Sequence, residues 1–244
     1  GSTSWVLTRD TVLPEFGVSV MVYDGVDESN TGWYVETSGT IVVDTTNVVI
    51  SKIGPHGPKV WIYNNDGVTW TFKTVVTGTT VVASAGPDTS VRLSDNGQYL
   101  TFGEGDANNR IGSVWVWRLN TTTDIWEITN NGSIDPVGFV GDTNQGLSTS
   151  ISKDGATFVT GGPLDTKSTG AAWVYTRDKF TWVQHGSKLV GSDAVGTIGG
   201  NADGVSMGSA VTISHDGNTI AMGGIYDVDI SGDTTGATWV FKNT

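Results

Sequence analysis

The chain has 244 residues, of which 37% are hydrophobic and 16% charged, enough apolar material for the core of one large domain. Its formal charge of −12 argues against nucleic acid and anionic membranes as partners, because phosphate binding requires clustered Lys and Arg. The sequence has no Cys, which excludes disulfides, thiolate metal sites and a Cys nucleophile, and no apolar stretch long enough to predict membrane insertion.

The 34 Gly and 10 Trp favour many short strands joined by tight turns over long helices. The first predicted strand is Ser4–Arg9, which contains Trp5. A long polar segment, Thr11–Glu36, comes next and carries the aromatic pair Trp33 and Tyr34. We expect this pair to lie in a loop, and it is the first candidate for ligand binding.

The rest of the chain consists of four repeated units, each with two predicted β-hairpins. In the second, third and fourth units the first hairpin reads "VRLSDNGQYLTFGEG", "TSISKDGATFVTGGP" and "VTISHDGNTIAMGGI". The turns at Gly97, Gly155 and Gly217 suit hairpins with positive φ, whereas the first unit has the degenerate "TIVVDTTNVVISKIG". The predicted units cover residues 37–76, 89–130, 147–186 and 207–244.

The second hairpin of each unit carries a Trp pair, as in "GPKVWIYNNDGVTWTFK", "GSVWVWRLNTTTDIWEI" and "GAAWVYTRDKFTWVQ". The two Trp lie 9, 11 and 9 residues apart in these copies (61 to 70, 115 to 126, 173 to 182). The fourth copy is divided between "GATWVFKNT" at the end of the chain and "TSWVLTR" near its start. Strict repetition predicts that these Trp residues form the packing between units.

Units of four strands repeated around a ring make a β-propeller. The divided copy predicts that residues 3–10 complete the last unit of the ring. The expected fold is therefore all-β, a single β-propeller domain over residues 1–244 with four four-stranded blades, the last closed by the N-terminal strand. A solenoid gives no reason to divide one unit between the termini. We expect a monomer, and a larger ring made of two copies stays open as an alternative.

The repeats resemble the FG-GAP family, the integrin-α-like propeller repeats found in many microbial and viral surface proteins. The resemblance is carried by "WVQHGSKLVGSDAVGTIGGNADGVSMGSAVTISHDGNTIAMGGIYD" and by Gly161-Gly162-Pro163, where the family has Gly-Ala-Pro. It covers about three of the four units, and Met207-Gly208 stands where the family has Phe-Gly. The resemblance implies a propeller at an extracellular, cell-surface or virion-surface location, although most such propellers have more than four blades.

Alternating strand direction predicts that the long loops, including Asn131–Gly146 and Gly186–Gly208, share one face of the disc. This assignment gives that face 16 of the 25 acidic residues, so it would attract a cation or a basic partner. The predicted ligand-binding residues on this face are Trp33, Tyr34, Glu104 and Asp106. The alternative, that long loops of an acidic chain are simply polar, stays open.

The segment "DVDISGD" places Asp227, Asp229, Ser231 and Asp233 in one loop of the fourth unit. Oxygen ligands at alternate positions followed by Gly are typical of Ca²⁺ loops. The FG-GAP family carries its Asp-rich Ca²⁺ loops in the turn of the first hairpin, so the placement differs. Ca²⁺ is the one predicted cofactor, and a plain solvated loop is the alternative.

No catalytic motif appears in the sequence, and its three His residues, His56, His185 and His215, occupy unrelated positions of the repeat. We therefore expect no catalytic residues and predict a non-catalytic binding or adhesion module of a surface or extracellular protein. The expected ligand is a protein or a glycan, engaged by the acidic long-loop face. A purely structural module and a glycan-active hydrolase or lyase remain alternatives.

Overall fold

A computed structural model describes residues 33–36, 46–54, 57–65, 70–77, 89–196 and 204–243. Before residue 90, side chains are described only at positions 60, 62 and 73–76. The described part contains fifteen β-strands and two four-residue helical turns. Within it, no helix is long and apolar enough to cross a membrane.

The strands form four antiparallel sheets, and the strands of each sheet pair in chain order. Sheet 1 comprises β1 (Trp33–Glu36), β2 (Thr46–Gly54), β3 (Gly57–Asn65) and β4 (Trp70–Thr77). Sheet 2 comprises β5 (Thr89–Leu93), β6 (Tyr99–Glu104), β7 (Ser113–Asn120) and β8 (Ile125–Ile128). Sheet 3 comprises β9 (Ser148–Ile151), β10 (Thr157–Gly162), β11 (Ala171–Asp178) and β12 (Thr181–Gln184). Sheet 4 comprises β13 (Met207–Ile213), β14 (Thr219–Gly224) and β15 (Ala237–Lys242). The predicted all-β class with antiparallel sheets is confirmed.

Sheet 1 begins earlier than the sequence predicts. Trp33 and Tyr34 lie on β1, paired with Lys52 and Ser51 of β2, so the expected loop position of the aromatic pair is wrong. The run "WYVE" is rich in the aromatic and β-branched residues that favour strands, and the polar residues before it extended the loop assignment too far. The predicted N-terminal strand, Ser4–Arg9, and its closure of the last unit lie outside the described residues.

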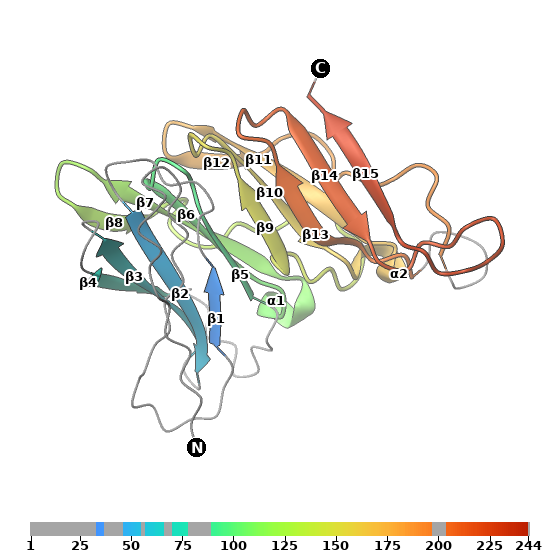
Figure 1. The fold of residues 1–244 in the computed structure, drawn as a ribbon, viewed down its shortest axis with the longest axis horizontal. Coiled ribbons are helices and arrows are strands. Elements are labelled where there is room, and N and C mark those ends of the chain that lie inside the picture. The colour runs from blue at the N-terminus through green and yellow to red at the C-terminus, as the bar shows by residue number, and fades with distance from the viewer. Residues whose placement is uncertain are drawn as a thin grey trace, which may run out of the picture.

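Each sheet lies beside the next in chain order, from sheet 1 at the left of Figure 1 to sheet 4 at the right. The first strands of sheets 2, 3 and 4 are neighbours, since β5 contacts β9 and β9 contacts β13, whereas sheet 1 contacts β5 through its second strand, β2. The hydroxyls of Ser90 and Thr149 are 2.7 Å apart across the first of these contacts. Across the second, the backbone N–H of Ile213 donates to the hydroxyl of Ser150 at 3.2 Å.

The predicted glycine turns are confirmed, because Gly97, Gly155 and Gly217 have φ of 67°, 65° and 73°. A serine begins each of these turns, and its carbonyl accepts the N–H of the glycine. The serine hydroxyl accepts the N–H of the residue that begins the next strand, at 3.0 Å for Tyr99 and Thr157 and 2.9 Å for Thr219. The turn chemistry therefore repeats along with the sequence.

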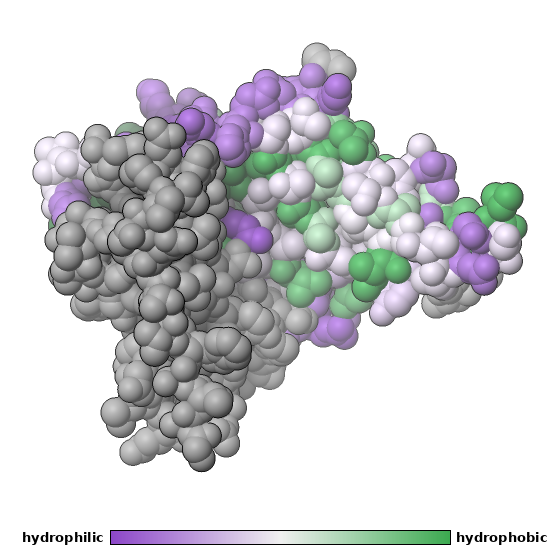
Figure 2. Space-filling view, viewed as in Figure 1, coloured by the Kyte–Doolittle hydropathy of each residue, from purple (hydrophilic) through white to green (hydrophobic). Residues whose placement is uncertain are grey.

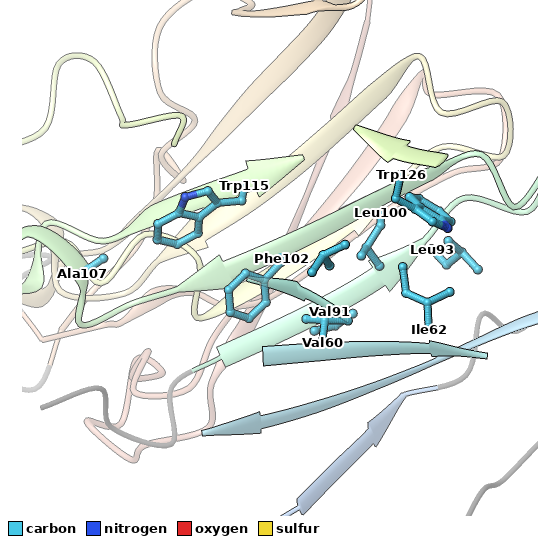
Figure 3. Packing of buried hydrophobic residues seen from close by; sticks show 10 residues of the cluster. Val60, Ile62, Val91, Leu93, Leu100, Phe102, Ala107, Trp115 and Trp126 are labelled. Atoms are coloured by element: carbon cyan, nitrogen blue, oxygen red, sulfur yellow. The ribbon is translucent and has the colours of Figure 1, made fainter. Parts of the chain in front are cut away.

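Buried side chains gather at the three junctions between consecutive sheets. At the first junction, Val60 and Ile62 of β3 point toward Val91 and Leu93 of sheet 2 (Figure 3). Trp115 and Trp126 belong to the same cluster, as the sequence predicts for the Trp pair. The second and third junctions have the same plan, with Trp173 and Trp182 in one and Trp239 in the other.

The loops divide between two ends of the sheets. The short-turn end comprises residues 94–98, 121–124, 152–156, 179–180 and 214–218, and the long-loop end comprises residues 105–112, 130–147, 163–170, 185–196, 204–206 and 225–236. The helical turns α1 (Ala107–Arg110) and α2 (Asp165–Ser168) both lie at the long-loop end (Figure 1). At the short-turn end, the N–H of Asn96 donates to the carbonyl of Lys153 at 3.2 Å.

Candidate functional site

The long-loop end is a continuous surface because its loops are hydrogen-bonded to one another across sheet boundaries. The carbonyl of Arg110 accepts the N–H groups of Thr143 and Asn144, both at 2.9 Å. The carbonyl of Thr143 in turn accepts the N–H of Leu164 at 3.1 Å. Since loops of several sheets are fixed in this way, their exposed side chains are presented on a rigid support.

Two aspartates at equivalent positions hold neighbouring loops in place. Asp165 accepts the N–H of Val140 and Asp227 accepts the N–H of Val195, each at 2.8 Å. Asp165 is completely buried and also pairs with the ammonium of Lys188. A buried carboxylate needs such partners, so Asp165 has a structural role, and Asp227, which is partly exposed, makes the equivalent contact to its neighbouring loop.

Other acids of the long-loop end are also hydrogen-bond acceptors. Asp135 accepts from the Ser113 hydroxyl at 2.7 Å and from the Asn108 amide at 3.3 Å. Asp193 accepts the indole N–H of Trp239 at 2.7 Å. Four of the acids that the sequence assigns to this face, Asp135, Asp165, Asp193 and Asp227, therefore hold loops in place by hydrogen bonds.

The predicted calcium residues Asp227, Asp229, Ser231 and Asp233 lie together in the β14–β15 loop. The carboxylate of Asp229 accepts the N–H groups of Ser231 at 2.8 Å and Asp233 at 3.0 Å, which makes a tight turn. Among the described residues, no three or more His, Asp or Glu side chains are grouped so as to hold a metal ion. Calcium binding by this loop stays a prediction.

Glu104 differs from every acid above. It ends β6, is 1% exposed, and neither carboxylate oxygen has a hydrogen-bond partner in the structure. Strand alternation places it on the same face as Leu100 and Phe102, at the edge of the first junction. Burial, with a smaller contribution in the same direction from the carboxylate of Asp106, raises the pKa of Glu104 to about 7.

The repeat shows that a side chain at the position of Glu104 is exceptional. The equivalent residues are Gly162 and Gly224, where a Cβ would lie 2.7 Å from the ring of Trp173 and 2.9 Å from the ring of Trp239. Sheet 2 instead carries a carboxylate at this position. Of the predicted ligand-binding residues, Glu104 is buried and interacts electrostatically with Asp106, whereas Trp33 and Tyr34 lie on β1 in sheet 1, and ligand binding by these residues stays a prediction.

The long-loop end also exposes apolar side chains, which sequence reasoning missed. It holds eight of the twelve large apolar side chains that are exposed in the described residues: Val137, Phe139, Val140, Val190, Val195, Ile225, Tyr226 and Ile230. Exposed apolar groups gathered at one end of a molecule are typical of interaction surfaces. The signal was present in "PVGFV" and "GGIYDVDI", where apolar residues interrupt loops expected to be polar.

The histidines do not meet in the described residues. His215 lies at the short-turn end, 3.6 Å from Asp95, and His185 comes directly after β12 at the long-loop end. His56 is outside the described residues. These positions agree with the separation that the repeat predicts.

No protein-family model matches the chain, and no curated protein matches it significantly. The FG-GAP resemblance therefore stays a prediction. Solved structures that do match include TolB from Acinetobacter baumannii, 15% identical, with 83% of this chain and 41% of that chain covered and a TM-score of 0.39. The β-propeller domain of the trilobed protease from Pyrococcus furiosus is 10% identical, with 86% and 69% covered and a TM-score of 0.34.

A protein from Bacteroides fragilis is 15% identical, with 58% of this chain and 36% of that chain covered and a TM-score of 0.38. The chain thus spans less than half the length of the Acinetobacter and Bacteroides proteins. TM-scores below 0.5 carry no conclusion about fold or function. The fold and the function are therefore argued from the sheets and loops of the chain itself.

Proposed function

We propose that the chain is a non-catalytic binding module of a surface or extracellular protein, and that the long-loop end engages a protein ligand. The observation that carries the proposal is the gathering of exposed apolar side chains on loops that are hydrogen-bonded to one another. The rigid support lowers the entropy lost when a partner binds. The exposed acids beside the apolar groups favour a ligand with basic as well as apolar side chains.

The proposed architecture is a β-propeller whose four sheets are its blades. Three four-stranded sheets and a fourth with three described strands, with the first strands of sheets 2, 3 and 4 side by side, support this arrangement. In sheets 2 and 3 a fourth strand pairs with the strand that carries the central Trp, whereas the described part of sheet 4 ends at β15. We assign the fourth strand of this sheet to Ser4–Arg9, whose Trp5 has the spacing of the other second Trp residues.

Binding arrays test the proposal. The wild-type chain should bind members of a panel of extracellular proteins and basic peptides. Ile230→Ser, which removes a fully exposed apolar side chain from the long-loop end, should weaken that binding. Ile125→Ser is the matched control, because Ile125 is also exposed but lies beside the short-turn end.

Three outcomes would contradict the proposal. Equal loss with Ile230→Ser and Ile125→Ser would remove the long-loop end as the binding surface. Binding and turnover of a glycan on a parallel glycan array would favour the hydrolase or lyase alternative. Absence of binding to every panel member would favour a structural module.

A further inference from the structure

The sequence contains two Asn-Gly steps, Asn96-Gly97 and Asn131-Gly132. Because glycine has no Cβ, its backbone nitrogen can approach the side-chain amide of a preceding asparagine with little steric hindrance. Attack by that nitrogen forms a cyclic imide, which is the first step of spontaneous deamidation and one reason why asparagine is thermolabile. The two steps have the same sequence, but the structure gives them different surroundings.

Asn96 is held by the hairpin turn in which it lies. Its side-chain oxygen accepts the hydroxyl of Ser94 at 2.6 Å and the backbone N–H of Gln98 at 3.0 Å. Its side-chain amide donates to the carbonyl of Asp154 in the neighbouring turn at 3.0 Å. The N–H of Gly97, the group that would attack, donates to the carbonyl of Ser94 at 2.8 Å. Both groups that would have to meet are therefore restrained by hydrogen bonds.

The same restraint recurs in the other two glycine turns. Asp154 accepts the hydroxyl of Ser152, and Asp216 accepts the hydroxyl of Ser214. Each of these aspartates also accepts the N–H of the residue that follows the glycine, at 3.0 Å and 3.1 Å. The side chain before each turn glycine is thus held in place by the repeat itself.

Asn131 lies outside the repeated turns and lacks such contacts. It is exposed at the start of the 130–147 loop, and its side chain makes no hydrogen bond to any residue that the structure describes. The N–H of Gly132 donates to the carbonyl of Thr129 at 3.3 Å, which is long for a backbone hydrogen bond. A Cβ at Gly132 would have no atom within 4 Å, so this Asn-Gly step lies in open space.

We propose that Asn131 is a site of spontaneous deamidation in the folded protein, and that the turn protects Asn96 from the same reaction. The backbone nitrogen of Gly132 bonds to Cγ of Asn131 and gives its proton to solvent. The Cγ–Nδ2 bond breaks, and Nδ2 takes up a proton from solvent and leaves as ammonia. Water then adds to either carbonyl of the imide, which opens to aspartate or isoaspartate. The net reaction consumes water, releases ammonia and involves no oxidant or reductant, and the inference is independent of the proposed function.

The modification falls in a short segment that is fixed at both ends. At its start, the side chain of Asn130 accepts the N–H of Trp182 at 2.8 Å and donates to the carbonyl of Trp182 at 2.9 Å. At its end, Ile134 and Val114 exchange backbone hydrogen bonds of 2.7 Å and 3.1 Å. Isoaspartate adds a carbon atom to the backbone between these two anchors, so we expect at least one of them to be displaced.

The product also adds negative charge to the long-loop end, since aspartate and isoaspartate are ionised at neutral pH. Hydrophobic and hydrophilic residues already lie side by side at this end, as the β14–β15 loop at the right of Figure 2 shows. The 130–147 loop carries the exposed side chains of Val137, Phe139 and Val140. Deamidation therefore changes both the charge and the support of a loop that presents apolar groups to solvent.

Peptide mapping by mass spectrometry tests the proposal on the full chain, incubated at mildly alkaline pH and body temperature. Conversion at Asn131 should be at least about 10-fold faster than at Asn96, because the hydrogen bonds of Asn96 must break before attack. A methyltransferase specific for isoaspartate should label the peptide that contains residue 131. In denaturant the two Asn-Gly steps should convert at similar rates, because the restraint on Asn96 comes from the fold.

Two variants provide the controls. Asn131→Gln should abolish labelling of the peptide that contains residue 131. Ser94→Ala removes the hydroxyl that holds Asn96 and should speed conversion at Asn96 by about 3-fold or more, with no change at Asn131. Circular dichroism establishes that Ser94→Ala is folded, and if it is not, the comparison of the folded and denatured wild type decides.

Equal conversion at the two steps in the folded wild type, or faster conversion at Asn96, would overturn the proposal. Absence of conversion at Asn131 over a period in which the denatured chain converts would also overturn it. The same preference for Asn131 in denaturant would show that the difference arises from the flanking sequence, which contradicts protection by the turn.

Discussion

Val174 and Val240 hold the same position in the third strands of consecutive sheets, yet Val174 is 8% exposed and Val240 61%. Each comes directly after the Trp of its strand, and Val174 packs among residues of the next sheet. The strands themselves are alike, so the difference in exposure depends on whether a further sheet packs against them. Each sheet buries its outward face only when another sheet is placed against it.

We predict that the repeated Trp residues are required for stability. Trp173 and Trp182 are buried in the second junction, and the indole N–H of Trp173 donates to the carbonyl of Val137 at 3.1 Å. Trp173→Ala and Trp182→Ala should each lower the free energy of unfolding by about 3–5 kcal/mol. Phe180→Ala, which removes an exposed ring, should have little effect in the same denaturant titration. The reverse order would mean that the Trp residues belong to a binding surface.

Glu104 should make stability depend on pH. Its pKa is about 7 in the folded chain against an ordinary value of 4.5. The folded state therefore binds this proton more tightly than the unfolded state does. The contribution of Glu104 to the free energy of unfolding is fully present below pH 4.5 and is lost as the pH rises through 7. The loss should amount to about 3 kcal/mol. Glu104→Gln should raise the melting temperature at about pH 8 and leave it nearly unchanged at pH 4.5.

Glu127→Gln is the control for Glu104→Gln, because the amide of Asn120 and the guanidinium of Arg118 lower the pKa of Glu127. The lowered pKa of Glu127 adds to the free energy of unfolding at pH values above the ordinary pKa of a glutamate, and this contribution is lost as the pH falls. The control should therefore lower or leave unchanged the melting temperature at about pH 8. If both variants changed the melting temperature equally at each pH, the carboxylate of Glu104 would have hydrogen-bond partners in solution.

The N-terminal strand should contribute directly to stability. Deletion of residues 1–10 removes Trp5, and loss of a buried Trp costs about 3–5 kcal/mol. The deletion should lower the melting temperature measured by circular dichroism. A deletion variant that melts together with the full chain would contradict the assignment of Ser4–Arg9 to the fourth sheet.

The calcium prediction for the β14–β15 loop concerns Asp227, Asp229, Ser231 and Asp233. A ligand that binds only the folded state adds about 2.7 kcal/mol at a hundredfold excess over its Kd. Millimolar Ca²⁺ should raise the melting temperature of the wild type relative to chelator, and should not do so in Asp229→Ala/Asp233→Ala. Equal shifts in both proteins, or the same shift with Mg²⁺, would indicate general screening of the charge of −12.

The repeat predicts much of the fold because its signals are local. Gly97 and its equivalents require positive φ, and the Trp positions obey strand alternation, so neither depends on distant contacts. The predicted start of sheet 1 is wrong because its hairpin lacks the glycine turn and polar residues precede β1, so the strand-favouring run of β1 was assigned to the loop. The contact between Asp165 and Lys188 depends on the path of two loops, which composition does not encode.

The candidate site is predictable only in outline. Alternating strands correctly bring the long loops to one end, and hydrogen bonds between loops confirm that grouping. The burial of Glu104 escapes sequence reasoning, because an acid after "LTFG" looks like the first residue of a loop. The alignment of Asp165 with Asp227, both shortly after a Gly-Gly pair, is a readable sign that these acids hold loops.

The central claim, that the long-loop end is the binding surface, is tested most directly by hydrogen–deuterium exchange with a protein or peptide identified on the arrays. Saturating ligand should protect backbone amides in residues 130–147, 163–170 and 225–236. Amides in the short turns at 94–98, 152–156 and 214–218 should exchange at unchanged rates. Protection confined to the short turns, or spread over both ends alike, would contradict the account.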